Sequence, residues 1–502
     1  MKIRTLVIVS IVALFFIFSG DLVGQNSDSI NLKAKSRKNW FAKDIKVSSE
    51  QVTMQDLLKG PENDWLVYHG DYGANHYSPL TEITSKNVGT LVPKWVYKIN
   101  DGAYLRSSPV VQNGIMYVTS ANEVHALDAR TGQWLWIWQA YDKRSTGINR
   151  GVAIYGDKLL FSTLDCRLVA LNKETGNLLW SNHYAKTTDN YFSTMTPLVI
   201  KGDTVVVGVS NSNDYARGFI AAFSITDGKE LWRFWTLPAD GPLLGAPTWL
   251  TGSYDPVADV IYWAVGTVPD RQRGDRQIYD TPNSFHDSIV ALEAKTGKLK
   301  WQVRLARHLP IDWDPNEPLV LLDSGKQKLI LLANRSGMYY VIDRENGNII
   351  LEKPFIDKLN WDETKGVICP SVRGATNWMP PSYNPITKLL YVMTLEGCVD
   401  ESNSYYVKAI EPLTGNEKWR YASRGVNIST PGILSTAGNV VFSSEGSGHV
   451  VALDAMTGNK LWDFNTAWPI FAAPMSYAVD GSQYVAIVAG SDVINFSLFK
   501  AQ

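Results

Sequence analysis

Two carboxylates in the segment HLPIDWDPNEP are spaced so that they can act together. Asp312 and Asp314 stand two residues apart, so on an extended strand both side chains would face the same side. A carboxylate can act as a general base if it reaches the proton that it removes and has a suitable pKa. A solvated Asp-Trp-Asp turn is the alternative that this spacing leaves open.

Several other kinds of chemistry are disfavoured by the sequence. It contains no cluster of histidines at metal-ligand spacing and no serine nucleophile motif, which argues against hydrolase or lyase chemistry. It contains no Cys-x-x-Cys-His motif for a c-type haem, so electrons from a redox reaction would have to leave through a separate partner. A formal net charge of -1 gives no support for binding to nucleic acid or to an anionic membrane.

A short repeated pattern must build the scaffold that positions these residues. Its first copy is ALDARTGQWLW, and successive copies end at Trp136, Trp180, Trp232, Trp301, Leu351, Trp419 and Trp462. Each copy is typical of a strand, a tight turn in which glycine adopts a positive φ, and a second strand whose Trp returns to a core. A unit of this size cannot bury its apolar face alone, so the tandem copies predict small four-stranded sheets stacked around an axis.

The repeat therefore predicts an all-β fold, an eight-bladed β-propeller when the segment around Trp95 is counted as part of the ring. The C-terminal segment QYVAIVAGSDVINFSLF is predicted to pair with N-terminal strands and close the ring, which removes exposed sheet edges. Two intervals, from Ala222 to Ala291 and from Val341 to Ala409, exceed the roughly 40 to 50 residues that a blade needs. We expect these intervals to carry binding loops, because they are rich in Gly, Pro, Trp and Asp.

The N-terminus predicts export. A basic start precedes an apolar run from Leu6 to Phe18, which is shorter than the roughly 20 apolar residues of a membrane span and is typical of a signal peptide, assigned here to residues 1–24. An uncleaved anchor is the alternative. Residues 25–63 are predicted to form a leader with a short helix, and residues 64–502 the propeller. The mature protein is expected to be secreted or periplasmic, with no membrane span.

Segments outside the repeat occur in a distinctive order. They are Trp65, Tyr72, Tyr77-Ser78-Pro79-Leu80, Asn87-Val88, Asn149-Arg150-Gly151, Arg217-Gly218, Trp249 with Tyr254-Asp255-Pro256, Asn334-Arg335-Ser336-Gly337 and Leu434-Ser435-Thr436-Ala437-Gly438. In these segments the chain resembles the pyrroloquinoline-quinone (PQQ) dependent dehydrogenases, which are eight-bladed quinoprotein propellers. The resemblance implies oxidation of a small, polyol or polymeric alcohol to an aldehyde or ketone, with electrons passed to an external acceptor such as a cytochrome c.

The resemblance also implies a set of cofactor-binding residues. Trp249 matches the floor under the planar quinone, a role that suits a polarisable indole, although packing within a blade is the alternative. Arg150, Thr194 and Ser210 match positions that hold the carboxylates of PQQ, although the two hydroxyls could equally serve turns.

At the reactive end of the quinone, Arg335 matches the basic residue beside the carbonyls and Asn377 matches a polar contact. Asp312 matches the catalytic base, which takes the hydroxyl proton while hydride leaves the alcohol carbon. Asp314 matches a position where some members have an Asp and use a lanthanide instead of calcium.

The chain departs from the family around the metal. The family's Glu and Asn ligands are replaced by Asn213 and Thr267, so the expected site for calcium or a lanthanide, completed by Asp312 and Asp314, is a weak one. These substitutions leave a second interpretation open, in which the protein is a cofactor-less PQQ-like propeller that acts as a binding or assembly scaffold.

Further departures surround the cofactor position. Arg106 stands where many members have Glu, and Thr430 stands where many have Trp. Arg144 and Ser145 replace a vicinal disulfide that covers the quinone in several members. Another family feature is retained, because Cys369 and Cys398 match a disulfide found in part of the family, which leaves Cys166 outside it.

Overall fold

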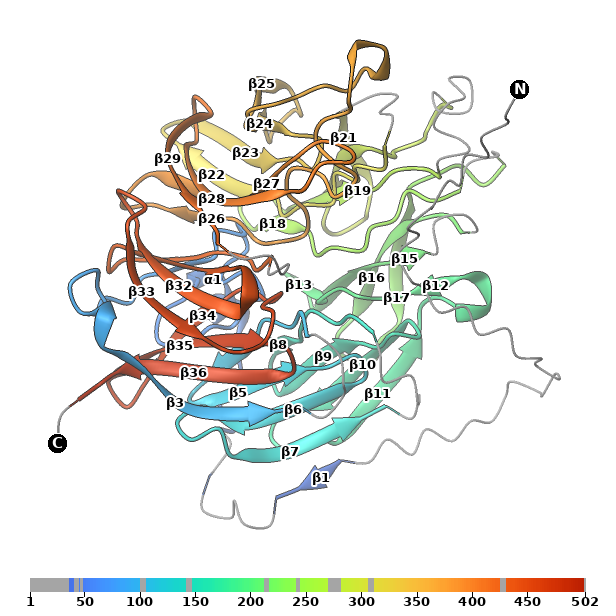
Figure 1. The fold of residues 1–502 in the computed structure, drawn as a ribbon. Helices are drawn as coiled ribbons and strands as arrows, with labels where there is room; N and C mark the ends of the chain where they lie inside the picture. Colours follow the sequence, from blue (N-terminus) through green and yellow to red (C-terminus); the bar gives the residue numbers. More distant parts are fainter. Residues whose placement is uncertain are drawn as a thin grey trace, which may run out of the picture. The chain divides into compact units, whose positions relative to one another are not determined.

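Eight antiparallel sheets follow one another along the chain as the blades of a propeller, which confirms the predicted fold class (Figure 1). The computed structural model describes residues 36–39, 45, 48–99, 105–140, 147–211, 216–240, 244–269, 281–305, 311–424 and 430–500. The predicted signal at residues 1–24 lies outside these ranges, as do Arg144, Ser145 and Asn213. Within them, no helix has the length and apolar character needed to span a membrane.

Each blade contributes four strands to the ring. Blade 1 contains β4 (Val110–Gln112), β5 (Ile115–Thr119), β6 (Glu123–Asp128) and β7 (Trp134–Gln139); blade 2 contains β8 (Ala153–Tyr155), β9 (Lys158–Ser162), β10 (Arg167–Asn172) and β11 (Leu178–His183); blade 3 contains β13 (Leu198–Ile200), β14 (Thr204–Gly208), β16 (Phe219–Ser224) and β17 (Glu230–Trp235); blade 4 contains β18 (Ser253–Asp255), β19 (Val260–Val265), β20 (Ser288–Glu293) and β21 (Leu299–Arg304).

The second half of the ring repeats this order. Blade 5 contains β22 (Val320–Ser324), β23 (Gln327–Ala333), β24 (Met338–Asp343) and β25 (Ile349–Pro354); blade 6 contains β26 (Ser382–Asn384), β27 (Leu389–Glu396), β28 (Ser404–Glu411) and β29 (Asn416–Ala422); blade 7 contains β30 (Leu434–Thr436), β31 (Val440–Glu445), β32 (His449–Asp454) and β33 (Lys460–Asn465); blade 8 contains β34 (Met475–Val479), β35 (Ser482–Ala489), β36 (Asp492–Leu498) and β3 (Leu91–Lys98).

Shorter elements decorate this frame. They are β1 (Arg37–Lys38), which extends blade 1, β2 (Tyr77–Ser78), which extends blade 7, the pair β12 (Tyr191–Phe192) and β15 (Ser210–Asn211), helix α1 (Met54–Lys59), and the single 3-10 turns η2 (Val88–Thr90), η3 (Thr187–Asp189), η4 (Glu363–Lys365) and η5 (Gly446–Gly448).

The ring is closed by strands from the two ends of the chain. Figure 1 shows the blue strand β3 beside the red strand β36, and the two pair antiparallel from Leu91 with Leu498 to Lys98 with Asp492. The outer strand of blade 8 is therefore N-terminal, and the Trp95 segment belongs to the ring as predicted. The ring is therefore closed by a main-chain ladder inside blade 8.

At six of the eight junctions the repeated Trp joins its blade to the next one through a hydrogen bond, a step further than the return to a core that the sequence predicted. The indole N–H of Trp136 in blade 1 donates to the carbonyl of Lys173 in blade 2 at 3.2 Å. The same ring covers Gly176, which has φ 68° and has no room for a side chain, since an added Cβ would lie 2.5 Å from the indole. Equivalent bonds of 3.0–3.2 Å join Trp95 to Ala129, Trp180 to Ile225, Trp232 to Ala294, Trp301 to Arg344 and Trp419 to Ala455.

The junction between blades 5 and 6 departs from this arrangement, because Leu351 occupies the Trp position. The hydroxyl of Tyr339 donates to the carbonyl of Pro412 at 2.8 Å, the group that an indole would reach at this junction. The ring contact is smaller here, with the Leu351 side chain beside Gly415. Blade 5 is therefore held to blade 6 with less apolar contact than its neighbours have.

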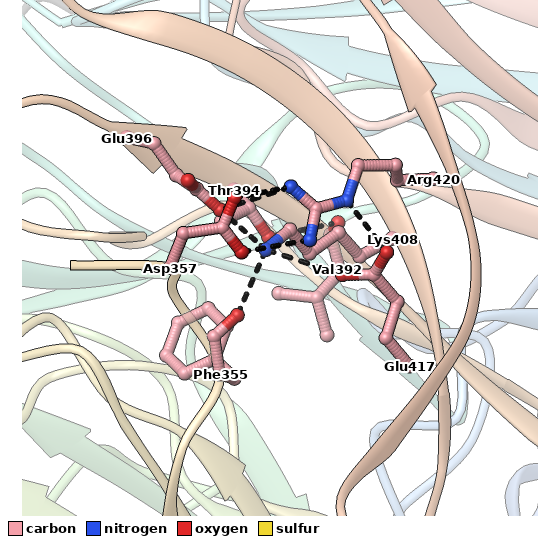
Figure 2. Close-up of polar contacts among 8 residues, drawn as sticks. All are labelled: Phe355, Asp357, Val392, Thr394, Glu396, Lys408, Glu417 and Arg420. Carbon is pink, nitrogen blue, oxygen red and sulfur yellow. Dashed lines mark hydrogen bonds and ion pairs between the residues drawn. The ribbon is translucent and has the colours of Figure 1, made fainter.

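An ion network centred on the buried Lys408 lies at the same junction (Figure 2). The Lys408 side chain is only 1% exposed; its ammonium donates to the Phe355 carbonyl at 2.9 Å and pairs with Glu396 and, at 3.3 Å, with Glu417. The Arg420 guanidinium binds both oxygens of Asp357 at 2.7 and 2.8 Å and also donates to Glu417. Since Phe355 and Asp357 follow blade 5 while the other residues belong to blade 6, the network ties the two blades together.

We predict that Lys408→Met destabilises the protein by about 3–5 kcal/mol, because it removes the buried cation that pairs with the partly buried Glu396 and binds the Phe355 carbonyl. Chemical denaturation followed by tryptophan fluorescence measures the change. The matched control is Lys460→Met in blade 7, whose side chain is 32% exposed and pairs with Asp463 at 3.2 Å; it should cost about 1 kcal/mol or less. Equal losses in the two variants would contradict the role assigned to the network.

An N-terminal segment, residues 63–78, runs across the inner strands of most blades; we call it the axial segment. Its main chain bonds to that of the blades through Asn63 with Ala478, Trp65 with Val111, Tyr72 with Tyr254, Gly73 with Leu321, Asn75 with Tyr383 and His76 with Ser435, at 2.7–3.4 Å. These partners belong to or adjoin the innermost strands of blades 1, 4, 5, 6, 7 and 8. The segment therefore lines the ring on its axis.

The axial segment carries two buried histidines. His69 and His76 are 3% and 0% exposed, and their ring centroids are 6.4 Å apart. Nε2 of His76 lies 2.8 Å from the Pro474 carbonyl oxygen. Burial lowers the pKa of His69 to about 3, with a smaller contribution from His76, and lowers the pKa of His76 to about 4. Both rings are therefore neutral in the folded protein at neutral pH.

These histidines predict a loss of stability in acid. Because both pKa values lie below the ordinary value of 6.5, protons favour the unfolded chain, and the loss begins as the pH falls below about 6.5. We expect His69→Phe to recover about 1–2 kcal/mol of unfolding free energy at pH 5 relative to pH 7.5, at about 1.4 kcal/mol per pH unit. Denaturation at the two pH values measures this, and an unchanged pH dependence in a folded His69→Phe variant would contradict it.

Candidate active site

The candidate site residues come from two kinds of connection. Arg150, Thr194, Trp249, Asp314 and Asn377 precede the first strands of blades 2, 3, 4, 5 and 6. Ser210, Thr267 and Arg335 lie between the second and third strands of blades 3, 4 and 5. Strand direction alternates within an antiparallel blade, so both kinds of connection emerge on the same face of the ring. The repeat itself therefore gathers these residues around the axis at one end.

Arg150 is packed between two indoles. It is only 3% exposed, and its guanidinium carbon lies 4.9 Å from the centre of the Trp249 ring and 5.4 Å from that of Trp378. Nη1 donates to the Thr194 carbonyl at 2.9 Å, whereas the buried Nε has no hydrogen-bond partner in the described part of the chain. Burial lowers the pKa of Arg150 to about 10, so the group stays cationic at neutral pH.

Two hydroxyls adjoin this arginine. Thr194 Oγ1 lies 3.2 Å from Ser210 Oγ and donates to the main-chain oxygen of Trp249 at 3.3 Å. The structure therefore joins Arg150, Thr194, Ser210 and Trp249 in one connected group, as the sequence interpretation requires. Short hydroxyls beside a guanidinium are suited to binding a carboxylate.

Asp314, the second carboxylate of the Asp312–Asp314 pair, lies beside the same tryptophan. Asp314 Oδ1 accepts the Thr267 main-chain N–H at 2.6 Å, and Oδ2 accepts the Trp249 indole N–H at 3.3 Å. Burial, followed by the charge of Asp312, raises the pKa of Asp314 to about 7, while Arg335 acts in the opposite direction. Oδ1 of Asp312 is buried and has no partner among the residues described.

Arg335 is fixed to the loop that carries Asn377. Its guanidinium donates to the carbonyls of Val372 and Arg373 at 3.0 and 3.3 Å, and its main-chain N–H donates to Glu317 at 2.9 Å. Burial raises the pKa of Glu317 well above its ordinary value. The predicted disulfide is present and joins Cys369 in this loop to Cys398, which follows β27, at a Cα–Cα distance of 4.3 Å; Cys166 is buried outside it.

Sequence analysis missed two aromatic residues of the site, Trp378 and Phe471. Trp378 directly follows Asn377, whose side-chain oxygen accepts its main-chain N–H at 2.9 Å. Phe471 precedes the first strand of blade 8. Like Trp249, both residues stand four positions before the first strand of their blade. Comparing the residues at this position in every blade would have found them.

The described residues fit a planar anion well. The site brings together aromatic faces and the guanidinium groups of Arg150 and Arg106. The Nε atom of each arginine is buried and has no hydrogen-bond partner among the described residues. The fit to a cation is partial. Asp312 and Asp314 provide two interacting carboxylates, but the described chain holds no group of three His, Cys, Asp or Glu placed for a metal. The Thr267 hydroxyl donates to Asp287 at 3.3 Å.

Comparisons with known proteins agree with this geometry. The family profile for the glucose/ethanol/alcohol dehydrogenase β-propeller domain matches residues 65–358, and that for the outer membrane protein assembly factor BamB matches residues 285–497. The quinoprotein alcohol dehydrogenase PedH of Pseudomonas putida is 30% identical over 88% of this chain and 88% of its own length.

Solved structures give the same result. The quinohemoprotein alcohol dehydrogenase ADHIIG from Pseudomonas putida HK5 superposes with a TM-score of 0.82 and 28% identity, covering 90% of this chain and 83% of that one. A europium-containing methanol dehydrogenase shares the fold, with a TM-score of 0.78 and 24% identity over 88% of this chain and all of that one. The chain is therefore an oxidoreductase of the PQQ-dependent quinoprotein alcohol dehydrogenase family.

Proposed function

We propose that this protein oxidises an alcohol to an aldehyde or ketone with PQQ as its cofactor. Trp249, Arg150, Thr194 and Ser210 would hold PQQ, and Arg335 and Asn377 would contact its reactive end. The observation that carries the proposal is the buried Arg150 guanidinium, packed on Trp249 and Trp378 with an unpartnered Nε among the described residues. A buried cation without a counter-charge is costly unless a ligand supplies the charge. Bound PQQ would supply the acceptor for the hydride that leaves the alcohol carbon.

The protein's own residues would then have separate tasks. Asp312 would take the hydroxyl proton of the alcohol at Oδ1, the oxygen that no described residue occupies. Arg335 would favour negative charge on the oxygen of the cofactor nearest to it, because its guanidinium is held rigidly by two carbonyls. Asn377 would add a polar contact on the same side.

A cation is the second component that we propose. Asp312 and Asp314 would hold calcium or a lanthanide, with Asn213 and Thr267 as weaker neutral ligands. The raised pKa of Asp314 supports a cation site. Burial and repulsion from Asp312 favour a proton on Asp314, and a bound cation could take the place of that proton. One of these residues, Asn213, lies outside the described chain.

Electrons would leave through a separate acceptor such as a cytochrome c, since the chain contains no haem-attachment motif. We also propose that the protein works outside the cytoplasm, in the periplasm or as a secreted protein. The signal-like residues 1–24 and the disulfide support this location, because disulfides persist in oxidising compartments. The substrate would be a small, polyol or polymeric alcohol.

A cofactor-less scaffold is the second candidate function. The match of residues 285–497 to the BamB profile supports it, as do Asn213 and Thr267 at the metal positions. Titration with PQQ in the presence of calcium or a lanthanide separates the two functions. Bound-quinone absorption supports the dehydrogenase, and its absence under all cations supports the scaffold.

We predict that Asp312→Asn lowers dye-linked alcohol oxidation by about 10²–10⁴-fold, because it removes the proton acceptor, while PQQ still binds. Trp249→Ala should instead weaken PQQ binding first, because it removes the aromatic face. Steady-state turnover together with equilibrium dialysis of PQQ distinguishes the two variants. Full turnover in the Asp312 variant would remove this residue from the base role.

A further prediction concerns the metal. Because Asn213 and Thr267 replace stronger ligands, cofactor loading should be incomplete in the purified protein at micromolar calcium. The double substitution Asn213→Glu with Thr267→Asn should raise calcium affinity on the order of tenfold and raise PQQ occupancy with it. Calcium titration monitored by quinone absorption measures both. Saturation of the unaltered protein at micromolar calcium would contradict the prediction.

A further inference from the structure

Arg106 is a second arginine at the site, half-buried, on the connection that leads into blade 1. Its guanidinium carbon lies 5.5 Å from the centre of the Trp378 ring and 5.3 Å from that of Phe471. Its Nε is buried and, like that of Arg150, has no hydrogen-bond partner among the described residues. Trp378 thus contacts both guanidinium groups.

The charges around these two arginines are not balanced by the protein. No described carboxylate lies within ion-pairing distance of either guanidinium, whereas the buried cations Lys408 and Arg344 have two carboxylate partners each. The two arginines are also close enough for the charge of Arg106 to lower the pKa of Arg150. Stacking on aromatic rings offsets only part of the cost of burying two like charges. Such an arrangement is suited to a ligand with more than one negative charge.

Arginine is well adapted to this task. Its planar guanidinium presents several N–H donors in a fixed fork that can bind both oxygens of a carboxylate. Two such forks held against one indole can hold two carboxylates on one planar molecule. The hydroxyls of Thr194 and Ser210 lie beside Arg150, whereas Arg106 is stacked on the Trp378 and Phe471 rings.

We propose that Arg106 is a specificity-determining anchor that, together with Arg150, forms a clamp for separate carboxylates of one planar aromatic polycarboxylate. This rests on the proposed function, in which that ligand is PQQ, and it assigns to Arg106 a position where many family members have Glu. The affinity of this protein for PQQ therefore depends on a contact that the remaining cofactor-binding residues do not supply.

The test compares the dissociation constant of PQQ for the unaltered protein, Arg106→Gln and Arg106→Lys, in calcium, by quenching of tryptophan fluorescence and by equilibrium dialysis. We expect Arg106→Gln to weaken PQQ binding by roughly 10- to 100-fold. Arg106→Lys keeps the charge but loses the forked N–H donors, so its dissociation constant should lie between those of the unaltered protein and Arg106→Gln. Raising the salt concentration should weaken binding to the unaltered protein more than binding to Arg106→Gln.

A matched control distinguishes the loss of a PQQ contact from the loss of a stabilising arginine–tryptophan stack. Arg217 lies 4.2 Å from the Trp235 ring centre in blade 3, so Arg217→Gln removes a similar stack and should leave PQQ affinity unchanged. Thermal unfolding of each variant shows whether it is folded.

Three outcomes would count against the inference. Affinity unchanged within twofold in a folded Arg106→Gln variant would overturn it and leave the proposed function standing. An unchanged PQQ affinity accompanied by a raised KM for alcohols that carry a carboxylate would also overturn it, since Arg106 would then serve the substrate. Failure of the unaltered protein to bind PQQ under any cation would overturn the proposed function together with the inference.

Discussion

The ring depends on one contact, the packing of a tryptophan from one blade over a glycine turn of the next. In the Trp136–Gly176 pair the indole covers the turn and its N–H satisfies a main-chain carbonyl, so apolar burial and a directional hydrogen bond act together. A side chain at the glycine would collide with the ring. This contact recurs around the propeller and sets the spacing of the blades, and it thereby determines which connections meet on the axis.

The exception at Leu351 shows what else can hold two blades together. There the bond from the Tyr339 hydroxyl remains, as the Tyr117 hydroxyl bonds to Lys173 beside the Trp136 indole, and the network centred on Lys408 adds charge pairs where the indole is missing. The network binds Phe355 and Asp357, where the chain leaves blade 5 for the loop that carries the disulfide and Asn377. Rigidity at this junction and placement of the loop therefore have a common origin.

The site concentrates charges that the protein leaves unbalanced. Two guanidinium groups are stacked on aromatic rings without a described carboxylate partner, and the carboxylates of Asp312 and Asp314 are held near each other. Ordinary cores avoid both situations because buried charges require compensation. A ring locked by many blade-to-blade contacts can keep such groups in place, so a ligand that carries both an anionic part and a bound cation would complete the site.

The sequence by itself determined the fold class, the eight blades, closure by the two ends of the chain and the disulfide, because each follows from a local repeat or from segments matched to a known family. It also selected Arg150, Thr194, Ser210 and Trp249, which the structure joins in one group. The tertiary structure alone decided that Trp136 and its equivalents dock on the next blade, that His69 and His76 are buried on the axis, and that Trp378 and Phe471 enclose two arginines. Those contacts join residues from different blades, and their distances depend on how the ring closes, which no local pattern encodes.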